Sequence, residues 1–253
     1  MKAMILAAGL GTRLRPLTDS SPKALVELRD RPILSWIIAR LAGQGFTDII
    51  INAHHFSEQI VAFAERYNVA PPHTGTWLTV SVEEKLLDTG GGLENVSWFF
   101  DDGEPFVVHT ADVISDLDLT AMRSAHSASD ALITIAVKNR PGSRFFLFDE
   151  EMCLCGWKSD ITRETRIVRP GAGSLQAFPS MAVEIISPEI FTRWKVQAPF
   201  SLTDAMLALA AAGERIFAYE APETRWMDIG RFSDYQKASD TFGDAYFEGL
   251  TGR

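Results

Sequence analysis

Cysteine is scarce in this sequence: its 253 residues include two, Cys153 and Cys155. A lone C-x-C pair is a poor disulfide candidate and half a metal site at best, so we expect two reduced, structural thiols. Long apolar runs are also missing, and without a stretch of about 18 apolar residues we expect no membrane span. The short apolar run at the N-terminus is followed at once by arginines, which is untypical of a signal peptide. We therefore expect a soluble, cytoplasmic protein.

Positive charge is in short supply as well. Lysine and arginine number 24 against 33 aspartates and glutamates, which gives a net charge of −9. A basic face for non-specific nucleic-acid binding is not expected at this balance. One loop after the first apolar run nevertheless carries Arg13, Arg15 and Lys23 beside Gly9 and Gly11. Because glycines let backbone amides approach phosphate and cations neutralise it, this loop predicts a strongly anionic ligand.

Two common phosphate-binding motifs are absent from that loop. The pattern G-x-x-x-x-G-K-[ST] fails because the loop has no Gly-Lys pair. The dinucleotide pattern G-x-G-x-x-G fits Gly9 and Gly11, but Leu14 stands at the third position. No second strand ends in an acid at the required distance either. A cofactor for hydride transfer is therefore not expected.

Strand-like and helix-like segments alternate along most of the chain. Short apolar or alternating runs predict strands at residues 3–9, 47–53, 77–83, 105–112, 131–137, 181–187 and 215–221. Apolar residues at helical spacing predict helices at residues 31–45, 57–67, 118–129 and 201–214, with a final helix after residue 228. Ser57, and either Ser201 or Thr203, suit helix N-caps.

This alternation predicts one α/β domain over residues 1–253, a Rossmann-like three-layer αβα sandwich with a mixed, mostly parallel sheet. Between residues 138 and 180 the pattern changes to a hairpin that turns near 149–151, so we expect an antiparallel insertion there. Ligands of such sheets bind at the carboxyl ends of the strands. The glycine loop, Asp112 and Asp228 would share that edge.

The glycine loop closely matches one longer signature. Its sequence G-L-G-T-R, then P-L-T, then P-K (residues 9–23) resembles the G-x-G-T-R-x-x-P-x-T and P-K signature of the sugar-1-phosphate nucleotidylyltransferases. "LLDTGGGLENV" (86–96), "VVHTADV" (107–113) and "RWMDIGRFSDYQKA" (225–238) extend the resemblance along the chain. The short chain and "DTGGGL" look most like N-acetylmuramate-1-phosphate uridylyltransferases and short mannose-1-phosphate guanylyltransferases.

The resemblance implies that an NTP and a sugar 1-phosphate, UTP being favoured, are joined into an NDP-sugar and pyrophosphate by in-line attack. Both reactants are polyanions, so positioning and charge neutralisation dominate. The implied catalytic residues are Arg13, on the triphosphate, and Lys23, on a phosphate. Those lining the nucleotide would be Ala8, Gly9, Gly11, Thr12, Arg13, Thr89, Gly90 and Gly91. Arg15 is expected to be a surface charge.

The same resemblance implies a Mg²⁺ ion held by Asp112 and Asp228, because hard oxygen ligands suit that ion. Asn52 and Glu184 are the candidate sugar contacts, on the side where the insertion at 138–180 is expected. The nearby Asp116 and Asp118 are expected to serve as a turn residue and a helix cap.

Two positions depart from the family pattern. The middle strand commonly reads N-G-D or N-x-D, whereas this chain has Thr110-Ala111-Asp112. The sugar segment commonly has a glycine in F-x-G-I, where Ala182 stands in "FPSMAVEI" (178–185). An added methyl group could reshape the sugar pocket, so the sugar stays open.

Alternative functions also stay open. A mannose-1-phosphate guanylyltransferase is one, and a phosphocholine cytidylyltransferase is another, for which Trp98, Trp157 and Trp226 could supply an aromatic cage. A non-catalytic nucleotide- or sugar-binding regulator is a third. No hexapeptide repeat follows Asp228, so we expect no fused acyltransferase domain. A monomer or a homodimer is expected, with neither nucleic acid nor membrane as a partner.

Overall fold

The computed structural model describes residues 1–72, 75–195 and 197–251. The chain forms two compact units. The first comprises Met1–Leu86, Val108–Leu117 and Thr224–Arg253, and the second comprises Leu87–Val107 and Asp118–Glu223. Within the described residues, no helix combines the length and apolar character that crossing a bilayer requires. The expectation of a single domain over residues 1–253 stays a prediction.

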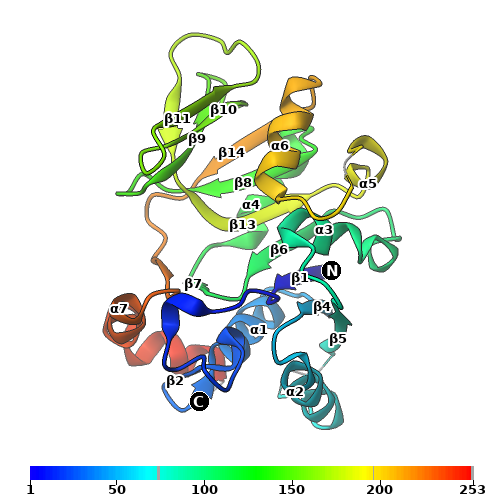
Figure 1. Cartoon of the computed structure of the whole chain (residues 1–253), viewed down its shortest axis with the longest axis vertical. Helices are drawn as coiled ribbons and strands as arrows, with labels where there is room; N and C mark the ends of the chain where they lie inside the picture. Colours follow the sequence, from blue (N-terminus) through cyan, green and yellow to red (C-terminus); the bar gives the residue numbers. More distant parts are fainter. Residues whose placement is uncertain (73–74, 196, 252–253) are drawn as a thin grey trace. The chain divides into compact units, whose positions relative to one another are not determined.

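The longer strands of the first unit run parallel to one another (Figure 1). β1 (Lys2–Leu6) pairs in parallel with β4 (Asp48–Ala53), which in turn pairs in parallel with β5 (Trp77–Val82). β6 (Phe106–Thr110) lies on the other side of β1. The centres of β1 and β4 are completely buried, which accounts for their continuous apolar runs.

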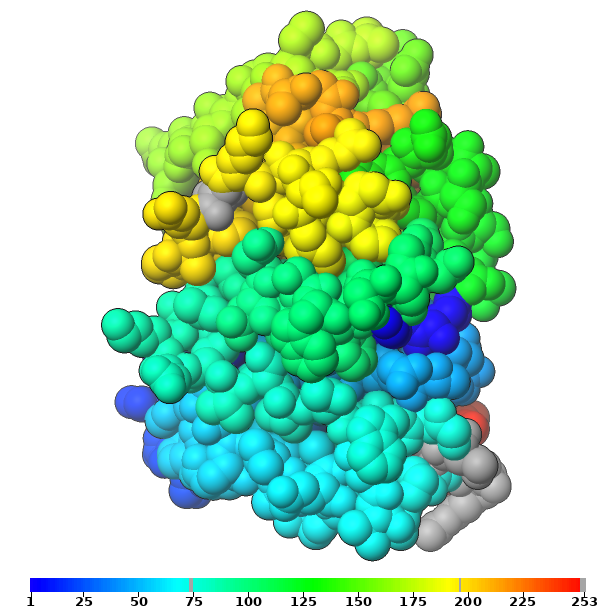
Figure 2. Space-filling model, turned by 90° about the vertical axis from the view of Figure 1, so that its right-hand side faces the viewer, coloured from blue at the N-terminus to red at the C-terminus, as the bar shows by residue number. Residues whose placement is uncertain are grey.

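The α-helices that the structure describes in the first unit are α1 (Ile33–Gly43), α2 (Ser57–Val69) and α7 (Phe232–Thr251). The apolar positions of α1 are buried at helical spacing, as predicted. α2 packs against β5, and both lie on the cyan face in Figure 2. The prediction that Ser57 caps α2 is wrong. Phe56, with a φ of 55°, holds the cap position without a side-chain hydrogen bond, because the chain turns there in the left-handed region.

Two short antiparallel pairs complete the first unit. β2 (Glu27–Leu28) and β3 (Arg31–Pro32) form a tight hairpin. β7 (Val113–Ser115) pairs with β15 (Trp226–Asp228), which joins two segments that are far apart in the sequence. The second pair matters for the site, because the backbone at Asp228 is thereby set beside the residue that follows Asp112.

The second unit contains a mixed sheet and an antiparallel one. β14 (Ile216–Glu220) is parallel to β8 (Ile133–Val137), and β13 (Ser180–Ile186) is antiparallel to β8. The second sheet has the order β11-β10-β9-β12 and confirms the predicted antiparallel insertion. Its strands are β9 (Arg144–Phe148), β10 (Leu154–Ser159), β11 (Glu164–Ile167) and β12 (Gln176–Phe178).

The helices of the second unit are α3 (Asp88–Glu94), α4 (Leu119–Ser129), α5 (Ile190–Arg193) and α6 (Leu202–Ala211). Ser201 caps α6, since its Oγ accepts a hydrogen bond from the Asp204 amide. Asp118 caps α4 in the same way, as predicted. Cys153 and Cys155 are free and buried. The α/β class with mixed, mostly parallel strands is thus confirmed.

Candidate active site

The glycine loop folds around a left-handed turn at Gly11, whose φ is 66°. The hydroxyl of Thr18 donates to the Gly11 carbonyl at 2.8 Å. A Cβ on Gly11 would lie 3.0 Å from Cγ2 of Thr18 and 3.2 Å from Cβ of Lys23. Glycine is therefore required by backbone conformation and by space. Gly11 thus packs beside the Lys23 side chain. Gly9 and Thr12 are exposed.

Lys23 forms an ion pair with Asp112. Lys23 begins the 3₁₀ helix Lys23–Leu25, and Asp112 lies between β6 and β7. Burial alone would raise the pKa of Asp112, but the Lys23 ammonium, through its charge and hydrogen bond, holds the pKa below its usual value, and Arg13 adds to the effect. Asp112 therefore carries a full negative charge at neutral pH.

The charged groups of the loop and of β15 converge at Gly230. A Cβ built on Gly230 would lie 2.6 Å from Asp228 Oδ1, 2.7 Å from Lys23 Nζ and 3.0 Å from Arg13 Nη2. The Gly230 amide donates to Asp228 Oδ1 at 2.7 Å. The Ile229 amide donates to the Asp112 carbonyl at 2.8 Å, which ties the two aspartate segments together. Arg13, Lys23, Asp112 and Asp228, chosen from the sequence, are thus brought into one site.

The donor set of this site fits a divalent metal ion only in part. Asp112 and Asp228 supply hard carboxylate oxygens of the kind Mg²⁺ prefers. Among the described residues, however, no group of three or more His, Cys, Asp or Glu side chains could hold a metal ion. Because Mg²⁺ commonly keeps waters and takes phosphate oxygens, two carboxylates suit an ion that arrives with a phosphorylated ligand.

Arg15 and His109 lie nearby without joining this cluster. Arg15 is exposed and pairs with Asp19 at 3.4 Å, as expected for a surface charge. His109 is buried, and burial lowers its pKa to about 4. Its Nδ1–H donates to the Thr110 carbonyl at 2.8 Å, so the imidazole is neutral at pH 7.

Asn52 is hydrogen-bonded to the backbone just after β1. Its Oδ1 accepts from the Ala7 amide, and its Nδ2 donates to Glu83 Oε1, both at 2.7 Å. Asn52 is almost completely buried. These bonds hold the backbone that leads into the loop at Ala8 and Gly9. The role of Asn52 as a sugar contact stays a prediction.

The three consecutive glycines, Gly90 to Gly92, lie inside α3 of the second unit. The amides of Gly90 and Gly91 both donate to the Phe200 carbonyl, at 3.0 and 3.1 Å. A side chain on Gly90 would overlap the Phe200 ring. Thr89 Oγ1 accepts from the Leu202 amide at 2.8 Å. Close helix packing therefore explains the glycines, and their contact with a nucleotide stays a prediction.

Glu184 lies on β13 of the second unit with its carboxyl group buried. Burial raises its pKa to about 8, while a hydrogen bond from the Ser180 hydroxyl, at 3.5 Å, opposes the shift. The carboxyl group is therefore mostly protonated at neutral pH. A protonated acid can donate a hydrogen bond, which suits the predicted contact with a sugar hydroxyl.

We expect Glu184→Gln to flatten the pH dependence of stability. The native state keeps a proton on Glu184 that the unfolded chain has lost, so the free energy of unfolding falls as pH rises from about 4.5 to about 8. Wild type should lose on the order of 4 kcal/mol relative to the variant across this window. Urea unfolding of both proteins at several pH values measures this change in the free energy of unfolding. If the difference in unfolding free energy between the two proteins stayed constant with pH, Glu184 would not be protonated in the native state.

Ala182 occupies a left-handed position, with a φ of 57°, at an irregularity in the β13–β8 pairing. This explains why glycine suits the corresponding place in the family signature. We expect Ala182→Gly to stabilise the protein by roughly 0.5–1 kcal/mol, because relief of strain exceeds the entropy cost of glycine. Ala177→Gly, on β12 at an ordinary φ, is the control and should destabilise. Thermal unfolding compares them, and a loss of stability in Ala182→Gly would refute the strain argument.

Sequence reasoning missed Gly230 and Thr18. Gly230 follows Asp228 by two residues, so a glycine close to a candidate metal ligand was the available signal. Thr18 is the threonine of the P-L-T signature, but its hydrogen bond to the Gly11 carbonyl depends on the fold of the loop. Of the suggested cage aromatics, Trp157 has the Arg166 guanidinium over its ring, 4.7 Å from the centroid. That face is therefore covered.

The α/β fold thus sets two cations, Arg13 and Lys23, against two carboxylates at one site. The family model for nucleotidyl transferases matches residues 2–147. The chain belongs to this nucleotidyl transferase family.

Several curated proteins are similar over most of the chain. The UTP–glucose-1-phosphate uridylyltransferase of Synechocystis is 29% identical over 94% of this chain and 62% of its own length. The probable mannose-1-phosphate guanylyltransferase 2 of Arabidopsis thaliana is 30% identical over 93% and 63%. The N-acetylmuramate α-1-phosphate uridylyltransferase of Neisseria meningitidis is 38% identical over 48% and 51%. The chain thus spans less than two thirds of the length of these relatives.

Solved structures support the fold. A putative glucose-1-phosphate thymidylyltransferase from Bacillus anthracis superposes with a TM-score of 0.76 at 17% identity, covering 98% of this chain and 99% of that one. At this identity, the likeness bears on the fold alone.

Proposed function

We propose that this chain transfers a nucleotidyl group from UTP to a sugar 1-phosphate, such as N-acetylmuramate 1-phosphate, and releases pyrophosphate. The observation that carries the proposal is the convergence of Arg13, Lys23 and Asp228 at Gly230, with Asp112 paired to Lys23. Family membership supports the reaction class. The reaction joins two polyanions, and this cluster can neutralise them.

In this mechanism the cations hold the phosphates for in-line attack. Arg13 is exposed, and its guanidinium is carried by a flexible side chain. The guanidinium can therefore bind the triphosphate and stabilise charge on the departing pyrophosphate. Lys23 can exchange its ion pair with Asp112 for a phosphate oxygen. The sugar phosphate is itself the nucleophile, so no protein nucleophile is needed. Positioning and charge neutralisation supply most of the rate.

Asp112 and Asp228 are the residues that would hold a Mg²⁺ ion. When bound, the ion supplies neutralisation of the α-phosphate and of the leaving group. The ionised state of Asp112 supports this assignment, because a carboxylate must be deprotonated to bind a metal.

UTP is favoured because two of the similar proteins are named as uridylyltransferases. Transfer from GTP to mannose 1-phosphate is the second candidate, because the Arabidopsis relative, which matches most of the chain, is named for that reaction. The protonated Glu184 suits either sugar, since both carry hydroxyl groups.

The test is Mg²⁺-dependent pyrophosphate release with UTP, GTP, CTP and dTTP against a panel of sugar 1-phosphates and phosphocholine. We expect turnover with UTP and N-acetylmuramate 1-phosphate. Turnover with GTP and mannose 1-phosphate would favour the second candidate instead. If the protein bound nucleotide but turned over no pair of substrates, the proposed enzymatic activity would be refuted. A non-catalytic nucleotide-binding regulator would then be favoured.

A further inference from the structure

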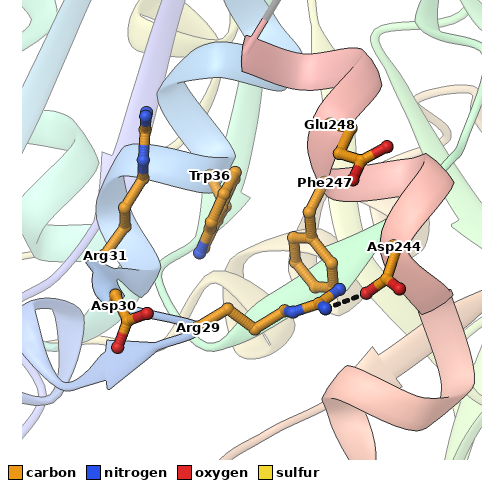
Figure 3. A pocket seen from close by; sticks show the side chains of 7 residues that line it. All are labelled: Arg29, Asp30, Arg31, Trp36, Asp244, Phe247 and Glu248. Atoms are coloured by element: carbon orange, nitrogen blue, oxygen red, sulfur yellow. Dashed lines mark hydrogen bonds and ion pairs between the residues drawn. The ribbon is translucent and has the colours of Figure 1, made fainter. Parts of the chain in front are cut away.

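The first unit has a hollow of about 570 Å³ whose lining includes none of the residues of the candidate active site. Its volume is typical of small-molecule pockets, which span about 300–1,000 Å³. The turn of the β2–β3 hairpin and the start of α1 form one wall, and the last part of α7 forms the other (Figure 3).

Two aromatic rings and two arginines contact one another in this hollow. Trp36 and Phe247 are almost completely buried and meet edge to face, with 4.8 Å between ring centroids. The Arg29 guanidinium lies 5.0 Å from the Phe247 centroid and is paired with Asp244. The Arg31 guanidinium lies 5.4 Å from the Trp36 centroid. Figure 3 shows Arg29 reaching Asp244 below Phe247, whereas Arg31 extends along Trp36.

The two arginines differ in whether their guanidinium groups are already paired with a carboxylate. The charge of Arg29 is already compensated by Asp244. In the part of the chain that the structure describes, the guanidinium of Arg31 makes no hydrogen bond or ion pair, and it lies over the Trp36 ring. A guanidinium presents a planar fork of donors that fits a phosphate or a carboxylate. The cation–π contact with Trp36 places the guanidinium at the hollow.

The hairpin turn is strained where it borders the hollow. Arg29 and Asp30 have φ values of 52° and 62°, both in the left-handed region. A two-residue turn of this kind usually carries Asn-Gly, because each L side chain there costs roughly 1–2 kcal/mol. Strain of this kind is retained preferentially at ligand-binding positions. Two charged residues therefore border the hollow at a strained turn.

We propose that this hollow is a second ligand site and binds a phosphorylated sugar. The charged groups of its lining are the guanidinium of Arg31 and the carboxylates of Asp30 and Glu248, beside the Arg29–Asp244 ion pair. One phosphate complements the guanidinium, and sugar hydroxyls can donate to the carboxylates. The two carboxylates disfavour a larger polyanion such as a nucleoside triphosphate.

Glucose 6-phosphate is the probe, because its anomeric carbon carries no phosphate and it cannot serve as the acceptor. In calorimetry we expect one site with a Kd between about 10 μM and 1 mM. Arg31→Ala should weaken binding at least about tenfold, and Arg31→Lys, which keeps the charge without the fork, should weaken it less. Arg66→Ala, an exposed arginine on α2, is the matched control and should bind normally.

Three results would overturn the proposal. They are the absence of saturable binding by wild type, normal binding by both Arg31 variants, and displacement of the probe by saturating UTP, which would place it in the active site. If inorganic phosphate bound as tightly as glucose 6-phosphate, the claim that the site recognises a sugar would be wrong. Thermal unfolding verifies that the variants fold. The assay needs no turnover, so its failure is distinguishable from a failure of the proposed function.

Discussion

Asp112→Asn should lower kcat/KM for pyrophosphate release by about 10³-fold, or about 4 kcal/mol of transition-state free energy. The substitution keeps the shape of the side chain and removes its charge. The amide can no longer pair with the Lys23 ammonium, and a proposed Mg²⁺ ligand is lost. Because Lys23 then has no carboxylate at Asp112, it should also be less well positioned. Initial rates at saturating Mg²⁺, with the best substrate pair, measure the effect.

Asp116→Asn is the matched control for this substitution. Asp116 lies four residues further along, and its carboxylate accepts from the amide and Nε of Arg225, each at 2.7 Å. It loses the same charge in the same unit without touching the cluster, so activity should stay within about threefold. If Asp112→Asn kept about a tenth of wild-type activity or more, the role of Asp112 would be wrong.

Gly230→Ala should lower kcat/KM by about 10²-fold with little loss of stability. Its new methyl group would lie 2.6 to 3.0 Å from Asp228 Oδ1, Lys23 Nζ and Arg13 Nη2, so all three must move. Arg13 and Lys23 can swing aside cheaply, because the contacts are at the ends of long side chains. The φ of Gly230 is not positive, so alanine suits the backbone. The fold should survive, whereas the phosphate-binding geometry should not.

Gly43→Ala, at the end of α1, is the matched control, because its new methyl group would meet nothing within 4 Å. It carries the same change in unfolded-chain entropy and should keep full activity. Kinetics and thermal unfolding of both variants separate the two effects. Wild-type activity in Gly230→Ala would show that the convergence of charges at this glycine is unimportant for the reaction.

Much of the fold could be predicted because local patterns agree with the tertiary arrangement. The apolar spacing of α1 and the continuous run of β1 each match burial in the structure. Helix caps were less certain: one of the two candidates for α6, Ser201, is the cap, but Ser57 is not, since Phe56 turns in the left-handed region instead. The close packing of the α3 glycines could not be predicted, because their partner, Phe200, is more than a hundred residues away in the sequence.

The sequence by itself determined the α/β class and the family signature, because periodicity and residue types at short spacing are displayed directly by the chain. The resemblance to the family then selected Arg13, Lys23, Asp112 and Asp228 as candidate site residues. Only the tertiary structure decided that Gly230 must lack a side chain, that Glu184 keeps its proton and that Arg31 faces a hollow. Those properties arise from what lies within a few ångströms in space, and residues distant in the sequence supply it.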